Sequence, residues 1–221
     1  MGITIKYLAH ASFQIIADGM TLYIDPSTKY TGLKDKDFTQ VDYILVTHKH
    51  DDHCDPKLIK KIRKLGHPVI APPNCKDAIK GIMWDLPPGQ FMQISDGPHV
   101  RAVHAYNITH TRPNGEPYHP KGFGVGYIIT IDGKKIYHAG DTDIIPEMDT
   151  LGMIDVALLP AGGTFTMDLE EAAEATRRID PEVAIPMHLK GADPAGFKTS
   201  VEGSSSVKVV LLSESEEYTL E

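Results

Sequence analysis

The feature that most restricts the fold of this chain is a run of histidine and aspartate residues directly after an apolar stretch. Residues 41–47 read Val-Asp-Tyr-Ile-Leu-Val-Thr, which predicts a buried strand, and residues 48–53 read His-Lys-His-Asp-Asp-His. Burying so many polar groups costs free energy unless each finds a partner, and a divalent metal ion satisfies several of them at once. The run therefore predicts a metal site at a strand end, and a solvated histidine-rich loop is the weaker interpretation.

Length and composition indicate a folded protein with an acidic surface. The chain has 221 residues, of which 41% are hydrophobic, so we expect a single domain over residues 1–221. A formal net charge of −8 disfavours a broad nucleic-acid-binding surface. Cys54 and Cys75 form no disulfide pattern, and neither a signal peptide nor a membrane-spanning stretch is recognisable. We therefore expect a cytoplasmic protein without membrane contact, and the sequence leaves a homo-oligomer open.

The first third of the sequence predicts strands followed by helices. Alternating apolar residues predict a β meander over residues 3–25. A basic helix is predicted over residues 55–66, with Leu65 on its inner face, because an aspartate and a proline open it and a glycine closes it. A second helix is predicted over residues 74–83.

The remainder of the sequence predicts a second strand-rich part. A hairpin is predicted over residues 124–138, and apolar strands are predicted at residues 155–159 and 183–187. A helix over residues 168–179 begins with an apparent capping box. Two sheets packed face to face with helices outside are the layered arrangement that this order favours.

Several of these apolar strands carry or precede further potential metal ligands. His104 lies in one strand, His138 and Asp141 lie at the end of another, and His188 directly follows a third. Each residue alone is a weak signal, since a lone histidine is more often an ordinary core or surface residue. Loops at one edge of a sheet converge on one cleft, however, so their joint recurrence indicates a shared site.

The order and spacing of these residues resemble the metallo-β-lactamase superfamily. The matching elements are His48-x-His50-x-Asp52-His53, then Gly140-Asp141-Thr142, then His188. Four flanking segments resemble the L-ascorbate-6-phosphate lactonase-like branch of metal-dependent hydrolases: residues 8–13, 137–142, 160–167 and 185–188. The resemblance spans nearly the whole chain and is specific for the superfamily, but it does not identify a substrate.

The resemblance implies an α/β protein, an αββα four-layer sandwich with a two-metal site between its halves. The implied ligands fall into three groups: His48 and His50 for the first metal, Asp52, His53 and His188 for the second, and Asp141 as a bridge. Two divalent ions are the implied cofactors, with zinc preferred and manganese or iron as alternatives.

The third protein ligand of the first metal is where this sequence departs from the superfamily pattern. His104 and His119 are equally good candidates, because His104 lies nearest to the usual position and His119-Pro120-Lys121 resembles a recurring His-Pro-Lys element in close relatives. The register also allows Asn107, and His110 is the weakest of the four candidates. The sequence does not choose among them.

Further polar residues are expected around these ligands. Metal-bound histidines usually donate their other ring nitrogen to a carboxylate or carbonyl, so Asp25 or Asp51 is expected to orient an imidazole. His10, Arg112 and Lys121 are the residues that we expect to bind substrate.

These residues together predict a metal-dependent hydrolase with a metal-activated water. The expected substrate is a small anionic molecule, such as a phosphoester, a lactone or a related ester or amide, with Asp52 or His138 transferring a proton. Three alternatives remain: a nuclease of the same superfamily, a redox iron protein on the same fold, and a non-catalytic metal-binding module. The acidic composition disfavours the nuclease, and the complete ligand set disfavours the module.

Overall fold

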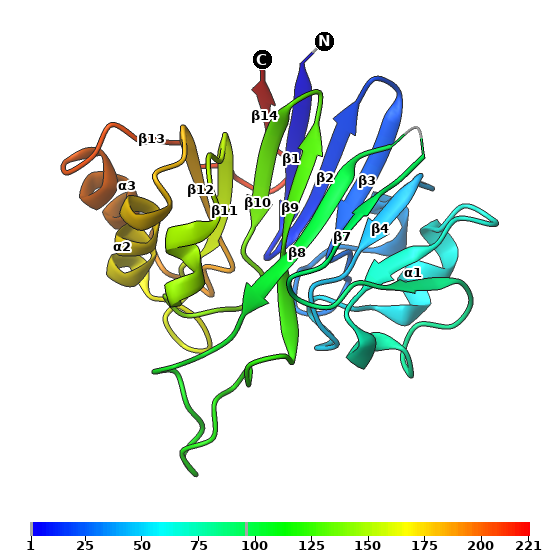
Figure 1. Cartoon of the computed structure of the whole chain (residues 1–221), viewed down its shortest axis with the longest axis horizontal. Helices are drawn as coiled ribbons and strands as arrows, with labels where there is room; N and C mark the ends of the chain where they lie inside the picture. The colour runs from blue at the N-terminus through cyan, green and yellow to red at the C-terminus, as the bar shows by residue number, and fades with distance from the viewer. Residues whose placement is uncertain (1, 96) are drawn as a thin grey trace. The chain divides into compact units, whose positions relative to one another are not determined.

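The computed structural model describes residues 2–95 and 97–221. Contacts between Cα atoms divide the chain into two compact units, unit 1 with Met1–Pro87 and Leu212–Glu221, and unit 2 with Pro88–Leu211. In the described residues, each unit contains one mixed sheet of seven strands (Figure 1). The expectation of a single domain over residues 1–221 stays a prediction.

The sheet of unit 1 joins an antiparallel half to a parallel half. Its strands are, in spatial order, β14 (Glu217–Leu220), β1 (Ile3–Ala9), β2 (Ser12–Ala17), β3 (Met20–Ile24), β4 (Tyr43–Leu45), β5 (Val69–Ala71) and β6 (Met83–Asp85). The pairs from β14 to β3 are antiparallel and those from β3 to β6 are parallel. The predicted meander is confirmed, and the strand predicted over residues 41–47 is present but shorter.

Helix α1 (Pro56–Ile62) follows the histidine-rich run and packs its apolar side into the core of unit 1. Asp55 caps its N-terminus by accepting hydrogen bonds from the backbone N–H groups of Lys57 and Leu58. The prediction that it reaches residue 66 was wrong, because Arg63 adopts an extended backbone and forms a β-bridge with Val41. Leu65 therefore lies outside the helix and is fully exposed instead of facing the core.

The helix predicted over residues 74–83 was also wrong. The chain forms only a short 3₁₀ turn, η2 (Pro73–Cys75), and then reaches the edge strand β6. Gly81 has a φ of +101°, which is outside the helical region, and Met83 pairs with Val69. Pairing along the sheet edge has replaced the local helical pattern.

The sheet of unit 2 also joins an antiparallel half to a parallel half. Its strands are, in spatial order, β13 (Lys208–Val209), β12 (Val183–Met187), β11 (Val156–Pro160), β10 (Lys134–His138), β9 (Gly124–Ile131), β8 (His99–Ala105) and β7 (Phe91–Gln93). The strands from β7 to β10 are antiparallel and those from β10 to β13 are parallel. The predicted hairpin and both predicted apolar strands are confirmed.

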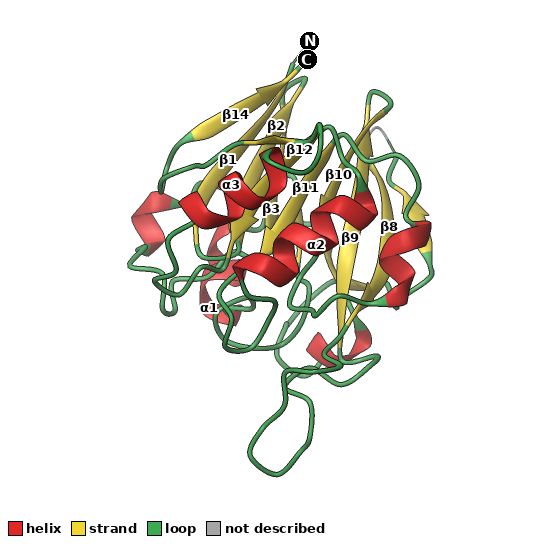
Figure 2. Cartoon of the chain, turned by 90° about the vertical axis from the view of Figure 1, so that its left-hand side faces the viewer, coloured by secondary structure: helices red, strands yellow, loops and turns green. Residues whose placement is uncertain are grey.

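Helices α2 (Leu169–Ile179) and α3 (Ala195–Glu202) lie across one face of this sheet (Figure 2). The predicted capping box is confirmed, since Asp168 and Glu171 each accept a backbone hydrogen bond from the other. Short 3₁₀ turns complete the helical elements, namely η1 (Asp35–Asp37) in unit 1 and η3 (Pro146–Thr150) in unit 2. No helix of the described residues is long and apolar enough to cross a membrane.

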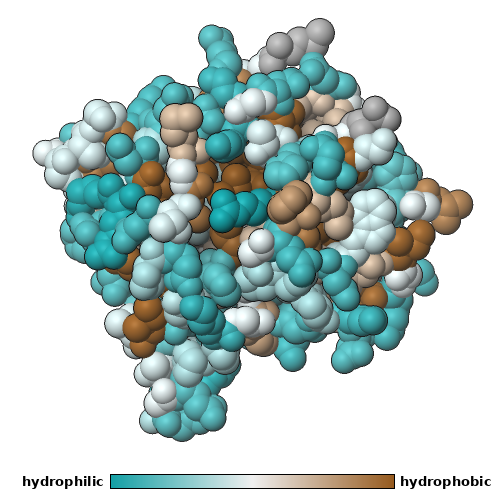
Figure 3. Space-filling model, viewed as in Figure 1, coloured by the Kyte–Doolittle hydropathy of each residue, from teal (hydrophilic) through white to brown (hydrophobic). Residues whose placement is uncertain are grey.

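The sheet of unit 2 gathers three polar loops at one edge. The parallel strands β10 and β12 end at the same edge, so the residues after them lie close together. The loop between β8 and β9, residues 107–121, starts and ends at this edge because Ala105 pairs with Gly124. It extends from unit 2 as a largely hydrophilic protrusion (Figures 1 and 3).

Candidate metal centre

The first two histidines of the run lie in a geometry that suits one metal ion. The Nε2 atom of His48 lies 3.0 Å from the Nδ1 atom of His50, and the two rings are nearly perpendicular. When two nitrogen atoms bind the same zinc ion, each at about 2.0–2.1 Å, the two atoms lie roughly 3 Å apart. The backbone turn from His50 to Cys54 fixes the loop, because the N–H groups of His53 and Cys54 both donate to the carbonyl of His50.

Asp25, directly after β3, orients two of the imidazoles in unit 1. Its buried carboxylate accepts hydrogen bonds from the Thr47 N–H (2.7 Å), the Thr47 hydroxyl (2.6 Å) and Nδ1 of His53 (2.7 Å). An ionised carboxylate can only accept hydrogen bonds, so the Thr47 hydroxyl donates its single hydrogen to Asp25. The hydroxyl oxygen must then accept from Nδ1 of His48, which lies 3.0 Å from it. Both histidines therefore present the lone pair of Nε2, the form that binds metals.

Asp52 joins these histidines to His10. Its Oδ2 atom lies 3.1 Å from Nε2 of His10 and 3.8 Å from Nε2 of His53. One ligand atom from each of these three residues lies within 4.8 Å of the others, so unit 1 alone contains a cluster able to hold a metal ion. The Asp52 side chain is 21% exposed, whereas that of His53 is fully buried. Asp52 is thus the acid in this cluster with access to solvent.

Unit 2 contains a second cluster, centred on Asp141. The Oδ2 atom of Asp141 lies 3.3 Å from Nε2 of His119 and 3.5 Å from Nε2 of His188, and all three side chains are buried. Asp141 follows β10, and His188 follows β12 with a φ of +52°, which is uncommon for a residue other than glycine. Two imidazoles that face one carboxylate oxygen provide nitrogen and oxygen ligands of the kind that zinc binds.

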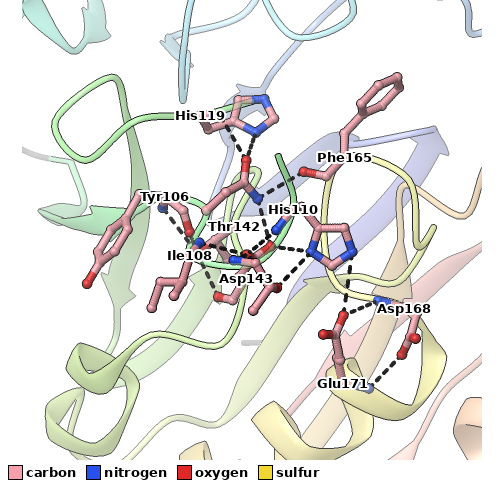
Figure 4. A network of polar contacts seen from close by, with 11 residues as sticks. Tyr106, Ile108, His110, His119, Thr142, Asp143, Phe165, Asp168 and Glu171 are labelled. Atoms are coloured by element: carbon pink, nitrogen blue, oxygen red, sulfur yellow. Dashed lines mark hydrogen bonds and ion pairs between the residues drawn. The ribbon is translucent and has the colours of Figure 1, made fainter. Parts of the chain in front are cut away.

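Of the four candidates for the remaining ligand, His119 lies beside Asp141, with 3.3 Å between its Nε2 atom and the Oδ2 atom of the carboxylate. His104 lies on β8, edge-on to the Tyr106 ring, and its buried Nδ1 has no hydrogen-bond partner among the described residues. His110 turns Nδ1 to Asp143 at 2.7 Å and Nε2 to Glu171 at 3.7 Å (Figure 4). The Asn107 amide nitrogen donates to Asp143 and to the Phe165 carbonyl.

The other predicted site residues occupy different environments. His138 is fully buried, and its Nδ1 accepts a hydrogen bond from the N–H of Gly140 at 3.2 Å. The exposed Arg112 lies over the Tyr118 ring at 5.0 Å. Lys121 is paired with Glu147 at 2.6 Å, and this carboxylate raises the pKa of Lys121. A free positive charge is therefore offered by Arg112 rather than by Lys121.

Sequence reasoning missed two residues of these clusters, namely Thr47 and Asp143. Thr47 and Asp143 are buried and each contacts a residue that holds a ligand histidine. Lys190 lies over the Phe165 ring at 4.6 Å and has a φ of +49°. The sequence offered a signal for Asp143 alone, because it follows Asp141 at a spacing of two in Asp141-Thr142-Asp143.

Gly162 allows the turn after β11 to pack against the backbone of His188. A Cβ atom at Gly162 would lie only 2.3 Å from the His188 carbonyl oxygen. We expect Gly162→Ala to destabilise the protein by about 1–3 kcal/mol, because backbone atoms have to move apart. Chemical denaturation measures this change. Gly196→Ala in α3 is the matched control, since its Cβ would meet Leu169 at an ordinary 3.6 Å, and equal stability losses for both variants would contradict the prediction.

Comparisons with known proteins show relatives along nearly the whole chain. The family model described as "Beta-lactamase superfamily domain" matches residues 4–188. A metal-dependent hydrolase of Pyrococcus abyssi is 36% identical over 99% of this chain and 100% of its own length. The solved structure of Igni18, a metallo hydrolase of Ignicoccus hospitalis, has a TM-score of 0.81 at 29% identity and covers 100% of this chain and 99% of its own. A solved structure from Parabacteroides distasonis has a TM-score of 0.86 at 33% identity, with coverages of 95% and 92%.

Proposed function

This chain belongs to the metallo-β-lactamase superfamily, and we propose that the clusters of its two units bind two divalent metal ions at one catalytic centre. The proposed ligands are His48, His50 and His119 for the first ion, Asp52, His53 and His188 for the second, and Asp141 as the bridge. Zinc is the preferred ion for this nitrogen-rich set, with manganese or iron as alternatives. The αββα sandwich is the fold of this superfamily, and the mixed sheet and helices of each unit agree with it.

The observation that carries this proposal is the orientation of three histidines by buried acceptors. Asp25 accepts Nδ1–H of His53, Thr47 accepts that of His48, and the Asn107 amide oxygen lies 2.8 Å from Nδ1 of His119. Each contact leaves Nε2 as the atom available to a metal. A histidine that served only for packing would not need the same ring orientation at three places.

The chain is a metal-dependent hydrolase, and its own residues supply the proton transfer. When bound, the ions would lower the pKa of a water molecule and polarise the bond to be cleaved. Asp52 is the proposed proton carrier, because its carboxylate is partly exposed and is held by His10 at 3.1 Å. A role for His138 in proton transfer stays a prediction, since its side chain is buried against Gly140.

The proposed substrate is a small anionic molecule, such as a phosphoester or a lactone that carries an acidic group. Arg112 and Lys190 are exposed cations above the rings of Tyr118 and Phe165. Tyr118 precedes the ligand His119, and Lys190 follows the ligand His188 by two residues. Positive charges so close to the ligands favour an anion. Lys121 is a weaker candidate for this role because Glu147 neutralises it.

Metal removal and reconstitution test the proposed function directly. We expect about two divalent ions per chain by metal analysis, and hydrolysis of aryl phosphodiesters or lactones that a chelator abolishes and zinc or manganese restores. A metal-loaded protein that is inert on the whole panel would favour the non-catalytic module. Preferential cleavage of RNA or DNA, which the net charge of −8 disfavours, would support the nuclease instead.

A further inference from the structure

A network of hydrogen bonds beside His119 is not explained by the proposed ligand set (Figure 4). Its centre is the carboxylate of Asp143, which is 2% exposed. The groups that donate hydrogen bonds to it are Asn107 Nδ2, the backbone N–H groups of Ile108, Thr109 and His110, the Thr109 hydroxyl and His110 Nδ1, at 2.7–3.0 Å. So many donors on one carboxylate fix the start of the 107–121 loop.

The charge of Asp143 is stabilised by these donors. An ionised carboxylate accepts hydrogen bonds on both oxygens, so the donors from Asn107, Thr109 and His110 compensate the burial of its negative charge. The network also reaches α2, because Nε2 of His110 lies 3.7 Å from Glu171, which accepts the backbone N–H of Asp168 at the start of that helix. The contact between His110 and Glu171 thereby attaches the 107–121 loop to helix α2.

The hydrogen bonds of Asn107 determine which way its amide points. Its Nδ2 atom faces two groups that can only accept, the Asp143 carboxylate at 2.7 Å and the Phe165 carbonyl at 3.0 Å. The amide oxygen must then face His119, where it lies 2.8 Å from both the backbone nitrogen and Nδ1. Nδ1 of His119 therefore carries the hydrogen, and Nε2 carries the lone pair that faces Asp141 at 3.3 Å.

We infer that Asn107 and Asp143 are positioning residues for His119, an inference that rests on the proposed function. Asp143 orients the Asn107 amide, and the amide fixes both the ring orientation and the protonated nitrogen of His119. Asn107 is thus the partner of a metal ligand and not a ligand itself, because both ends of its amide are used within the protein. His110 likewise belongs to the network and is not a proposed ligand, because its two ring nitrogens face the carboxylates of Asp143 and Glu171.

Metal affinity of the full chain tests this inference through a double-mutant cycle. Zinc affinity is measured by competition with a chromophoric chelator for Asn107→Ala, His119→Ala and the double variant. We expect Asn107→Ala to weaken zinc binding by about 10–100-fold, as loss of such outer partners does, and the double variant to bind like His119→Ala. The matched control is Asn114→Ala, in the same loop, whose exposed side chain bonds Glu116 and whose loss is expected to leave the affinity unchanged.

The protonation of the His119 ring gives a readout that a general loss of structure does not imitate. In ¹⁵N spectra of the metal-free chain we expect hydrogen on Nδ1 of His119, and a mixture of both neutral forms in Asn107→Ala. Should that variant not fold, Asp143→Asn is the second variant. Asparagine keeps the shape of the side chain but turns an amide N–H₂ toward at least one of the groups that now donate to Asp143. We therefore expect a mixture of both neutral forms of His119 and weaker zinc binding in this variant as well.

Two outcomes would overturn the inference, and they differ in what they imply for the proposed function. If His119→Ala weakens zinc binding while Asn107→Ala changes neither the affinity nor the ring protonation, the ligand set stands and the positioning role fails. If His119→Ala itself leaves zinc binding unchanged, His119 is not a ligand, and the proposed ligand set fails together with the inference.

Discussion

Replacing His50 with alanine is expected to lower kcat/KM for phosphodiester or lactone hydrolysis by about 10³-fold or more. His50 faces Nε2 of His48 at 3.0 Å, and the variant removes one of the proposed nitrogen ligands of the first ion. A metal ion contributes several kcal/mol to stabilising charge in the transition state, and each 1.36 kcal/mol corresponds to about tenfold in rate. Metal analysis is expected to show the loss of about one ion per chain.

The fold is expected to survive this substitution, because the His50 side chain is only partly buried. Its carbonyl, which accepts the N–H groups of His53 and Cys54, is retained in alanine. His99→Ala is the matched control, since this histidine begins β8, at the end of the strand opposite the 107–121 loop, with its ring beside Phe91. Turnover equal to that of the unmodified chain in His50→Ala would reject the assignment of the metal centre.

The elements that sequence reasoning predicted well are those with local signals. The capping box of α2 and the hairpin between β9 and β10 depend on residues close in sequence, and both are confirmed. The errors arose where distant residues decide. Helix α1 ends early because Arg63 pairs with Val41, and the helix expected after Asn74 gives way to an edge strand that pairs with β5. The local sequence pattern does not indicate either pairing.

The candidate ligands could be found from sequence because they follow apolar strands, but their partners could not. Choosing among His104, His110 and His119 requires the tertiary contacts of each ring nitrogen. The Asn107 amide and the Asp143 carboxylate come from different loops, and only the fold brings them to 2.7 Å. An imidazole was, by contrast, expected to be oriented by Asp25 or Asp51, and Asp25 contacts His53.

Both units orient histidines by the same physical means. In unit 1 the acceptor is the buried carboxylate of Asp25, and in unit 2 it is the Asn107 amide oxygen, which Asp143 holds in place. A neutral imidazole has one N–H and one lone pair, so an acceptor at Nδ1 assigns the lone pair to Nε2. The two arrangements differ in charge, because the first places a negative carboxylate directly on the histidine. The consequences of removing the acceptor are therefore expected to be largest at Asp25.

Replacing Asp25 with alanine is expected to destabilise unit 1 by about 3–5 kcal/mol, the range measured when one partner of a buried charged network is removed. The variant leaves the Thr47 N–H and hydroxyl and Nδ1 of His53 without the acceptor they now share. It also places alanine at a φ of +48°, which aspartate and asparagine tolerate better. The midpoint of urea unfolding of the full chain measures this change.

Asp25→Asn separates the effect of losing the charge from the effect of placing alanine at a positive φ. Asparagine keeps the shape and the left-handed backbone, so the expected loss of stability is smaller than in Asp25→Ala. Its amide N–H₂ must face one of the present donors, which disturbs the orientation of His48 or His53, and zinc affinity is expected to fall by about 10–100-fold. Asp77→Ala, an exposed aspartate of the same unit, is the control for removal of one negative charge. Zinc affinity in Asp25→Asn equal to that of Asp77→Ala would show that the Asp25 carboxylate does not orient the ligands, since both variants lose one negative charge and Asp25 is the aspartate bonded to His53.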